Sequence, residues 1–197
     1  MIVSFSKNFI FIHAVKTGGT SVATALLPHL TNGDLACGYP ESGFYPKHIW
    51  ASALRESMPH FDNFFSFGFV RNPWDRLVSN FFWWQQVDKR GWDTERFNRL
   101  VRGKTFKEYV LQGEWLVTSP CSDFFYDGPK CLVSEIGRFE DLNADFARIS
   151  GKLGISCPLG WENKSEHDDY RRYYTPAMVE MVAQRFRSDL DLFGYTF

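Results

Sequence analysis

A lysine, two glycines and three hydroxyl side chains stand together near the start of the sequence and could bind an anion. They are Lys16, Thr17, Gly18, Gly19, Thr20 and Ser21. Glycines let a backbone approach a ligand closely, and the N–H groups at the start of a helix attract anions. The pattern therefore predicts a phosphate-binding loop with Lys16 as its charge. It differs from the G-x-x-x-x-G-K-[ST] loop of nucleotide triphosphatases, because the lysine precedes the glycines. A tight turn with a solvated lysine is the alternative.

A second group of polar residues follows a different apolar segment. Arg71 comes directly after residues 64–70, and Ser79 lies eight residues further on. Arginine grips phosphate in a planar, bidentate manner, and a helix carries a hydroxyl two turns on to the same side. We therefore predict a second anion site formed by Arg71 and Ser79. We interpret Asp75 as a capping charge, and Arg76 is open between an anion contact and a surface ion pair.

Both groups need strands and helices to hold them. Apolar runs predict strands at 9–12, at 64–70 and near 131–133, and helical patterns cover 20–30, 74–87, 142–153 and 176–190. Pro73 suits the first position of a helix. Strands that alternate with helices favour the α/β class, here one domain over residues 1–197 with a mainly parallel central sheet flanked by helices. Such sheets bind ligands at the carboxyl ends of their strands, where both polar groups lie.

The two motifs together resemble those of a known family. Residues 11–21 (FIHAVKTGGTS) are similar to the phosphosulfate-binding loop of sulfotransferases that use phosphoadenosine phosphosulfate (PAPS), most closely the carbohydrate and bacterial branch. Residues 69–79 resemble that family's element for the donor's 3′-phosphate, and the likeness extends to residues 138–142 and 173–195. At 14–15 the chain has Ala-Val where relatives often have proline, which we expect to alter only the entry to the loop. The resemblance implies a P-loop-like sulfotransferase architecture.

The resemblance also implies a reaction and its residues. A sulfuryl group passes from PAPS to an acceptor hydroxyl or amine, leaving PAP as product, and no metal is expected. Lys16 and the loop N–H groups suit the leaving phosphate, where negative charge develops. The acceptor needs a base, and His48 is the first candidate, because imidazole accepts protons near neutral pH and Lys-His-Ile resembles a segment with a functional histidine in relatives. His13 is the second candidate, with a packed core role as its alternative, and Glu41 is the reserve.

Three further features allow two interpretations each. Residues 163–165 and 171–172 either close over the donor or form a solvated charged loop. The adjacent Trp83 and Trp84 either stack on an acceptor ring or pack in the interior. Residues 88–107 contain seven Lys and Arg against three Asp and Glu, and they either attract an acidic acceptor or form a solvated face.

Composition and the absence of other motifs narrow the classes of function. The net charge is −1, so no nucleic-acid partner is expected. No basic leader precedes a long apolar stretch, which predicts a cytoplasmic chain without a transmembrane segment. The rival functions are a nucleotide or small-molecule kinase, which would need an acidic Mg²⁺ ligand, and a non-catalytic PAP-binding module. A carbohydrate or other small molecule is the expected acceptor, and no sequence feature indicates an oligomeric state.

Overall fold

The computed structural model describes residues 1–37, 47–88, 95–117, 119–160 and 166–197. The chain forms two compact units, each built from two stretches of sequence. One contains residues 1–71 and 121–162, and the other contains residues 72–120 and 163–197. We call them the sheet unit and the helical unit and describe each by itself. The predicted extent of one domain over residues 1–197 stays a prediction.

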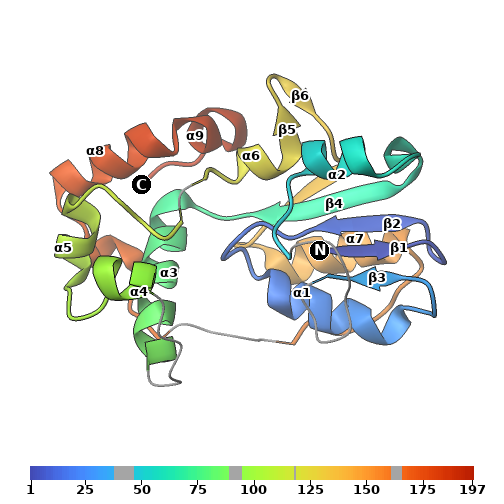
Figure 1. The fold of residues 1–197 in the computed structure, drawn as a ribbon, viewed down its shortest axis with the longest axis horizontal. Coiled ribbons are helices and arrows are strands. Elements are labelled where there is room, and N and C mark those ends of the chain that lie inside the picture. The colour runs from blue at the N-terminus through green and yellow to red at the C-terminus, as the bar shows by residue number, and fades with distance from the viewer. Residues whose placement is uncertain (38–46, 89–94, 118, 161–165) are drawn as a thin grey trace. The chain divides into compact units, whose positions relative to one another are not determined.

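The sheet unit is built on a five-stranded sheet with the strand order β3–β1–β2–β4–β7 (Figure 1). Its strands are β1 (Ile2–Ser4), β2 (Phe9–Ile12), β3 (Leu35–Ala36), β4 (Phe65–Val70) and β7 (Glu135–Arg138). β4 runs parallel to β2 and β7, whereas β1 is antiparallel to β2 and β3. The α/β class is therefore confirmed. The sheet is mixed rather than mainly parallel, because the turn at residues 5–8 folds β1 back on β2.

One face of this sheet is covered by α1 (Gly19–Leu26) and α7 (Leu142–Lys152). Aromatic side chains from β2 and β4 form a buried core with residues of both helices; its members include Phe9, Phe11, Phe67, Phe69, Val22, Leu26, Phe146 and Ile149. Successive residues of a strand point to opposite faces, yet all four residues of β2 are buried. Burial on both faces explains why β2 reads as a continuous apolar run in the sequence.

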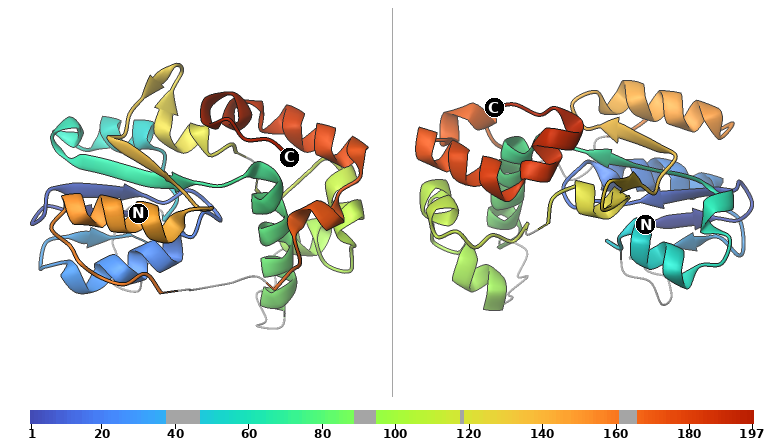
Figure 2. Two further views of the ribbon diagram at one scale, coloured as in Figure 1. Left: turned by 180° about the vertical axis from the view of Figure 1, so that it is seen from behind. Right: turned by 90° about the horizontal axis from the view of Figure 1, so that it is seen from above.

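The opposite face carries α6 (Ser122–Phe125), which contacts α2 (Ala51–Ser57) (Figure 2). Gly68 of β4 lies so close to α6 that an added Cβ would be 2.2 Å from Cε1 of Phe125. A side chain at Gly68 would therefore push α6 off the strand. The sheet unit also contains the hairpin of β5 (Tyr126–Asp127) and β6 (Lys130–Cys131) and the short 3₁₀ turns η1 (Leu27–His29) and η2 (Phe61–Asn63).

The helical unit contains α3 (Pro73–Asp88), α4 (Glu95–Leu100), α5 (Phe106–Leu111), η3 (Tyr170–Tyr173), α8 (Pro176–Arg185) and α9 (Arg187–Phe193). As the sequence predicted, α3 begins at Pro73. Oδ1 of Asn72 accepts hydrogen bonds from the N–H groups of Trp74 (3.1 Å) and Asp75 (3.3 Å). Asn72 therefore caps α3, and Asp75 is an acidic residue in its first turn. α3 packs against α5, α8 and η3.

Two predicted elements differ in the structure. Residues 131–133 do not join the central sheet, because Cys131 pairs with Tyr126 in the hairpin and the N–H of Leu132 donates to the carbonyl of Phe125 (2.8 Å). The edge strand begins later, at Glu135. The predicted closing helix is two helices, because the chain breaks at Phe186 between α8 and α9. Within the described ranges, no helix combines the length and hydropathy that crossing a bilayer demands.

Candidate functional site

The predicted phosphate loop leaves β2 and enters α1 through two residues in the left-handed region. Lys16 has φ 63° and Gly18, the N-cap of α1, has φ 77°. The buried hydroxyl of Thr17 donates to the carbonyl of Ala14 (3.0 Å), which closes the turn between them. The first turn of α1 contains no acidic residue. The positive end of the helix dipole is therefore not neutralised by a carboxylate of its own first turn.

The structure gives both glycines of this loop a packing role. An added Cβ on Gly18 would lie 2.7 Å from Cδ2 of Leu142, and the positive φ independently disfavours a side chain. An added Cβ on Gly19 would lie 2.1 Å from Cδ2 of His13. The sequence analysis attributed both glycines to close approach of a ligand. In the structure an added Cβ at either glycine would meet protein side chains, so the loop is also packed on α7 and on His13, and the approach of a ligand to its backbone stays a prediction.

The positive charges of Arg71 and Lys47 act on the pKa of Lys16 at this loop. Burial, followed by the positive charges of Arg71 and Lys47, lowers the pKa of the Lys16 ammonium to about 7. Nη1 of Arg71 donates to the carbonyl of Lys16 (3.3 Å). Burial also lowers the pKa of Lys47. Burial and the neighbouring cations disfavour the charged form of Lys16. A bound anion would favour that charged form, so the site is suited to bind an anion.

Arg71 follows β4 directly and is held in place by a ring from the next strand. It is only 6% exposed, and its guanidinium carbon lies 3.8 Å from the centre of the Phe139 ring. The N–H of Phe139 donates to the carbonyl of Val70 (2.8 Å), which continues the pairing of β4 with β7. Because β2, β4 and β7 are parallel, their carboxyl ends bring the Lys16 loop, Arg71 and Phe139 to the same edge of the sheet, as predicted for the first two.

His48 and His13 are also brought together in the sheet unit. Nδ1 of His48 lies 2.8 Å from the main-chain carbonyl oxygen of His13, and the two ring centres are 4.6 Å apart in an edge-to-face arrangement. A carbonyl can only accept, so Nδ1 of His48 carries a proton. The neutral ring then has its lone pair on Nε2, which is the nitrogen that can accept a proton. His13 is 3% exposed, and burial, followed by the charge of His48, lowers its pKa well below the ordinary value.

Ser79, the other residue of the predicted second anion site, belongs to the helical unit. It is a buried residue of α3. Its neighbour Arg76 is not part of a surface ion pair, since it is 1% exposed and pairs with Asp189 of α9 (4.0 Å), which is 0% exposed. Nη1 of Arg76 also donates to the carbonyl of Ser119 (2.9 Å). Arg76 therefore joins α3 to α9 and to the segment before α6, and the anion role of Ser79 stays a prediction.

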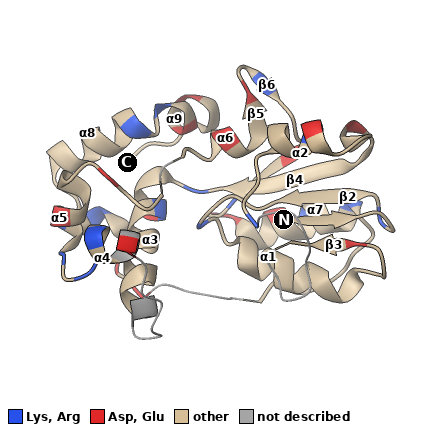
Figure 3. Cartoon of the chain, in the orientation of Figure 1, with Lys and Arg blue, Asp and Glu red and all other residues tan. Residues whose placement is uncertain are grey.

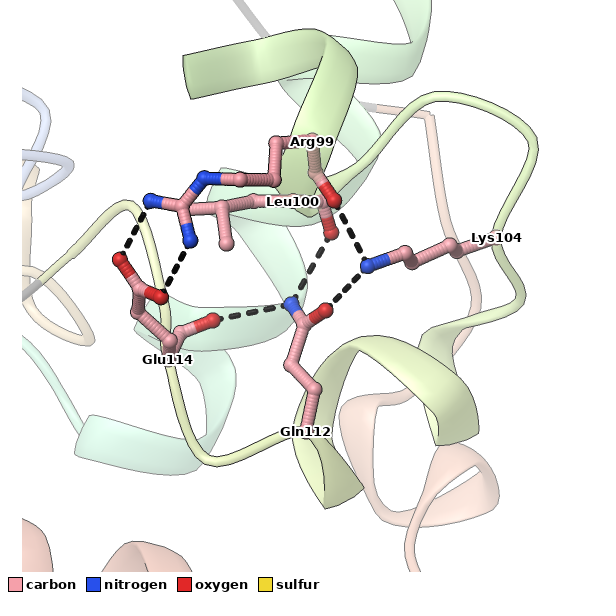
Figure 4. Close-up of polar contacts among 5 residues, drawn as sticks. All are labelled: Arg99, Leu100, Lys104, Gln112 and Glu114. Atoms are coloured by element: carbon pink, nitrogen blue, oxygen red, sulfur yellow. Dashed lines mark hydrogen bonds and ion pairs between the residues drawn. The ribbon is translucent and has the colours of Figure 1, made fainter.

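The basic stretch at residues 88–107 is partly engaged within the helical unit itself. Figure 4 shows Arg99 donating to both carboxylate oxygens of Glu114, at 2.6 and 2.7 Å. Lys104 donates to the carbonyl of Arg99 (2.8 Å) and to Oε1 of Gln112, whose amide in turn donates to the carbonyls of Leu100 (3.0 Å) and Glu114 (2.9 Å). α9 also carries charges of both signs, from Arg187, Asp189 and Asp191 (Figure 3). These contacts favour a structural role for Arg99 and Lys104.

Several sequence-predicted residues lie elsewhere. The reserve base Glu41 and residues 163–165 fall outside the described residues. Arg171 and Arg172 are exposed and pair with Asp169 (3.5 Å) and Asp168 (3.3 Å), which agrees with a solvated loop. The Trp83 and Trp84 rings are half-buried and touch each other at 5.0 Å between centres.

The sequence analysis missed two residues of the site. Phe139 supports Arg71, and Lys47 adds positive charge beside Lys16. Lys47 had a signal in the sequence, because it directly precedes the candidate base. Phe139 lies within the family-like residues 138–142, but its contact with Arg71 could not be read from the sequence, since it depends on the pairing of β7 with β4.

The chain is similar to known proteins in sequence and in structure. A family model described as "Sulfotransferase family" matches residues 1–196. A protein of Archaeoglobus fulgidus, named only "Uncharacterized protein", is 28% identical over 132 residues, which is 62% of this chain and 96% of that protein. The family match therefore extends over both compact units.

Solved structures of sulfotransferases resemble this chain to different degrees. Mouse sulfotransferase SULT7A1, crystallised as a complex with PAP, superposes with a TM-score of 0.56 at 17% identity, covering 95% of this chain and 86% of that one. A sulfotransferase from Alicyclobacillus acidocaldarius gives a TM-score of 0.47 at 14% identity, with 96% of each chain covered. The first likeness confirms the α/β architecture predicted from the sequence.

Proposed function

The chain belongs to the sulfotransferase family, and from that premise we propose that it transfers a sulfuryl group from PAPS to a hydroxyl or amine of a carbohydrate or other small molecule. The observation that carries this proposal is the contact between Arg71 and the Lys16 loop. It brings cations from two parallel strand ends to one edge of the sheet. PAPS carries phosphate at two separate positions, and each position needs a cationic side chain to bind it.

Lys16 and residues 17–21 are the proposed ligands of the 5′-phosphosulfate. The loop offers the first N–H groups of α1, whose first turn lacks a carboxylate, together with the Lys16 ammonium. The residues present fit this anion, because the lowered pKa of Lys16 reflects burial and neighbouring positive charge, and a bound phosphate would offset both.

Arg71 is the proposed ligand of the 3′-phosphate. Its guanidinium lies over the Phe139 ring, with one nitrogen donating to the carbonyl of Lys16. A guanidinium whose position is already fixed can bind a phosphate at little further cost in conformational entropy. Ser79 was predicted from the sequence to bind the same phosphate, and this role of Ser79 stays a prediction.

When bound, PAPS supplies a sulfuryl group that forms a bond to the acceptor oxygen or nitrogen as its bond to the phosphate oxygen breaks. His48 accepts the acceptor's proton at Nε2, while Nδ1–H stays on the carbonyl of His13. Lys16 and the N–H groups of α1 stabilise the negative charge that appears on the phosphate. The charged form of Lys16 is the one that does so, which makes its protonation state part of the mechanism.

Calorimetry and turnover test this proposal. We expect PAP to bind without Mg²⁺ and more tightly than ADP or ATP, and labelled PAPS to pass its sulfuryl group to a member of a panel of sugars, phenols and amines. His48→Ala should lower turnover by about 10²–10⁴-fold and leave PAP affinity nearly unchanged. A Mg²⁺-dependent preference for ATP would indicate a kinase instead. PAP binding without turnover of any acceptor would indicate a non-catalytic binding module.

A further inference from the structure

His13 occupies a position between the start of α1 and His48. It is 3% exposed, and its ring stacks on Phe11 with 5.6 Å between centres. On one side the ring lies against Gly19, where an added Cβ would be 2.2 Å from Nε2 of His13. On another side it meets the ring of His48 at 4.6 Å. A single buried ring therefore touches both the first residue of the loop helix and the candidate base.

The main chain of His13 makes a second contact with the same base. Its carbonyl oxygen accepts the Nδ1–H of His48 at 2.8 Å. The hydrogen bond at one imidazole nitrogen decides which nitrogen carries the proton, so this bond leaves the lone pair on Nε2. The ring contact and the hydrogen bond together fix both the orientation and the tautomer of His48.

His13 is poorly suited to be the base itself. Among the residues that the structure describes, none hydrogen-bonds Nδ1 of His13, and this atom is buried. A general base has to reach the proton that it removes, directly or through one water. The ring is instead packed against Phe11, Gly19 and His48, so its contacts are those of a buried packing residue.

We propose that His13 is a positioning residue for the transfer reaction: its ring, packed between Gly19 and His48, sets the place of the base relative to the donor loop and keeps the Nδ1–H of His48 on the main-chain carbonyl of residue 13, which holds the tautomer. This inference rests on the proposed function, because it takes His48 as the base. It differs from the role of a second base, which would need a nitrogen at position 13. A phenyl ring there should preserve function, whereas loss of the ring should not.

The tautomer of His48 can be measured without any acceptor. We would record ¹⁵N spectra of the imidazole nitrogens at about pH 8.5, two units above the ordinary histidine pKa, in the wild type, His13→Ala and His13→Phe. The wild type and His13→Phe should show mainly the Nδ1–H form, and His13→Ala should show a mixture with the Nε2–H form. An unchanged tautomer ratio in a folded His13→Ala protein would overturn the proposal. His13→Phe keeps the test decisive if His13→Ala fails to fold, since a loss of the Nδ1–H form in that variant also contradicts it.

Turnover of labelled PAPS then separates a positioning role from a general structural one. His13→Ala should lower kcat by roughly 10–100-fold, the scale of a misplaced catalytic group, while His13→Phe should stay near the wild-type rate. In a His48→Ala background the further change His13→Ala should have little effect, because the base that it positions is gone. An equal loss in both backgrounds would refute the inference. A wild type that neither binds PAP nor turns over PAPS would instead refute the proposed function, while the tautomer measurement would still report the contact.

Discussion

The lowered pKa of Lys16 predicts that PAP binding is coupled to proton uptake. In the free protein the ammonium has a pKa of about 7, because it is buried beside Arg71 and Lys47. A bound phosphate favours the charged form and should return the pKa to its ordinary value near 10.4 or above. Between these values the free protein has to take up a proton in order to bind, so the affinity falls as the pH rises. From the charged fraction at each pH, the affinity should fall by about 75-fold between pH 7.5 and 9.5.

Calorimetry with PAP across this range measures the effect directly. Repeating each titration in two buffers with different ionisation enthalpies gives the number of protons taken up, which should approach one at pH 8.5. Lys16→Arg is the matched control, since arginine stays charged throughout and should abolish the slope. His13 should not interfere, because burial lowers its pKa well below the ordinary value and the ring is neutral in this range. A flat affinity in the wild type would refute the coupling, and a slope that persists in Lys16→Arg would assign it to another group such as Lys47.

Three further predictions concern single side chains. Arg71→Ala should weaken the binding of PAP by about 1.5–3 kcal/mol, the scale of a charge-assisted hydrogen bond. It should weaken the binding of adenosine phosphosulfate much less, because that ligand lacks the 3′-phosphate. Equal losses of affinity for both ligands in calorimetry would contradict the assignment of Arg71 to the 3′-phosphate. Gly19→Ala should lower the free energy of unfolding, measured in urea, by about 1–3 kcal/mol, because the added methyl group clashes with the His13 ring. Gly151→Ala is the control, and it should be neutral or stabilising because the space around its Cβ is open. Asp189→Ala should cost about 3–5 kcal/mol by leaving the buried guanidinium of α3 without its carboxylate. The exposed helical pair broken by Asp191→Ala should change stability by under about 0.5 kcal/mol, and similar effects of the two substitutions would contradict the burial argument.

Local sequence was sufficient to predict the parts of the candidate site in which the polar residues directly follow a strand. The β2 run, the glycine loop and α1 follow one another without interruption, and Arg71 stands between the end of β4 and the proline that opens α3. Each of these segments is short, and its residue types are those that its backbone conformation or its charge requires. The position of Lys16 and Arg71 at one edge then follows from the parallel pairing of β2 with β4.

Long-range pairing decided what local sequence could not. Arg76 reads as a surface residue from its neighbours in sequence, and only the fold brings it to the buried Asp189 of α9. The antiparallel β1 is a three-residue strand whose direction depends on a turn, and β7 is set by its register with β4. The reason for glycine at position 19 was also out of reach, because it depends on the packing of His13.

A crystal structure of the protein with PAP tests the central claim most directly. We predict that the 5′-phosphate lies on residues 16–21, within hydrogen-bond distance of the first N–H groups of α1 and of the Lys16 ammonium, and that the 3′-phosphate contacts the Arg71 guanidinium. The same crystals would show whether the Ser79 hydroxyl contacts that phosphate. A complex in which either phosphate binds away from Lys16 and Arg71 would contradict the proposed donor site.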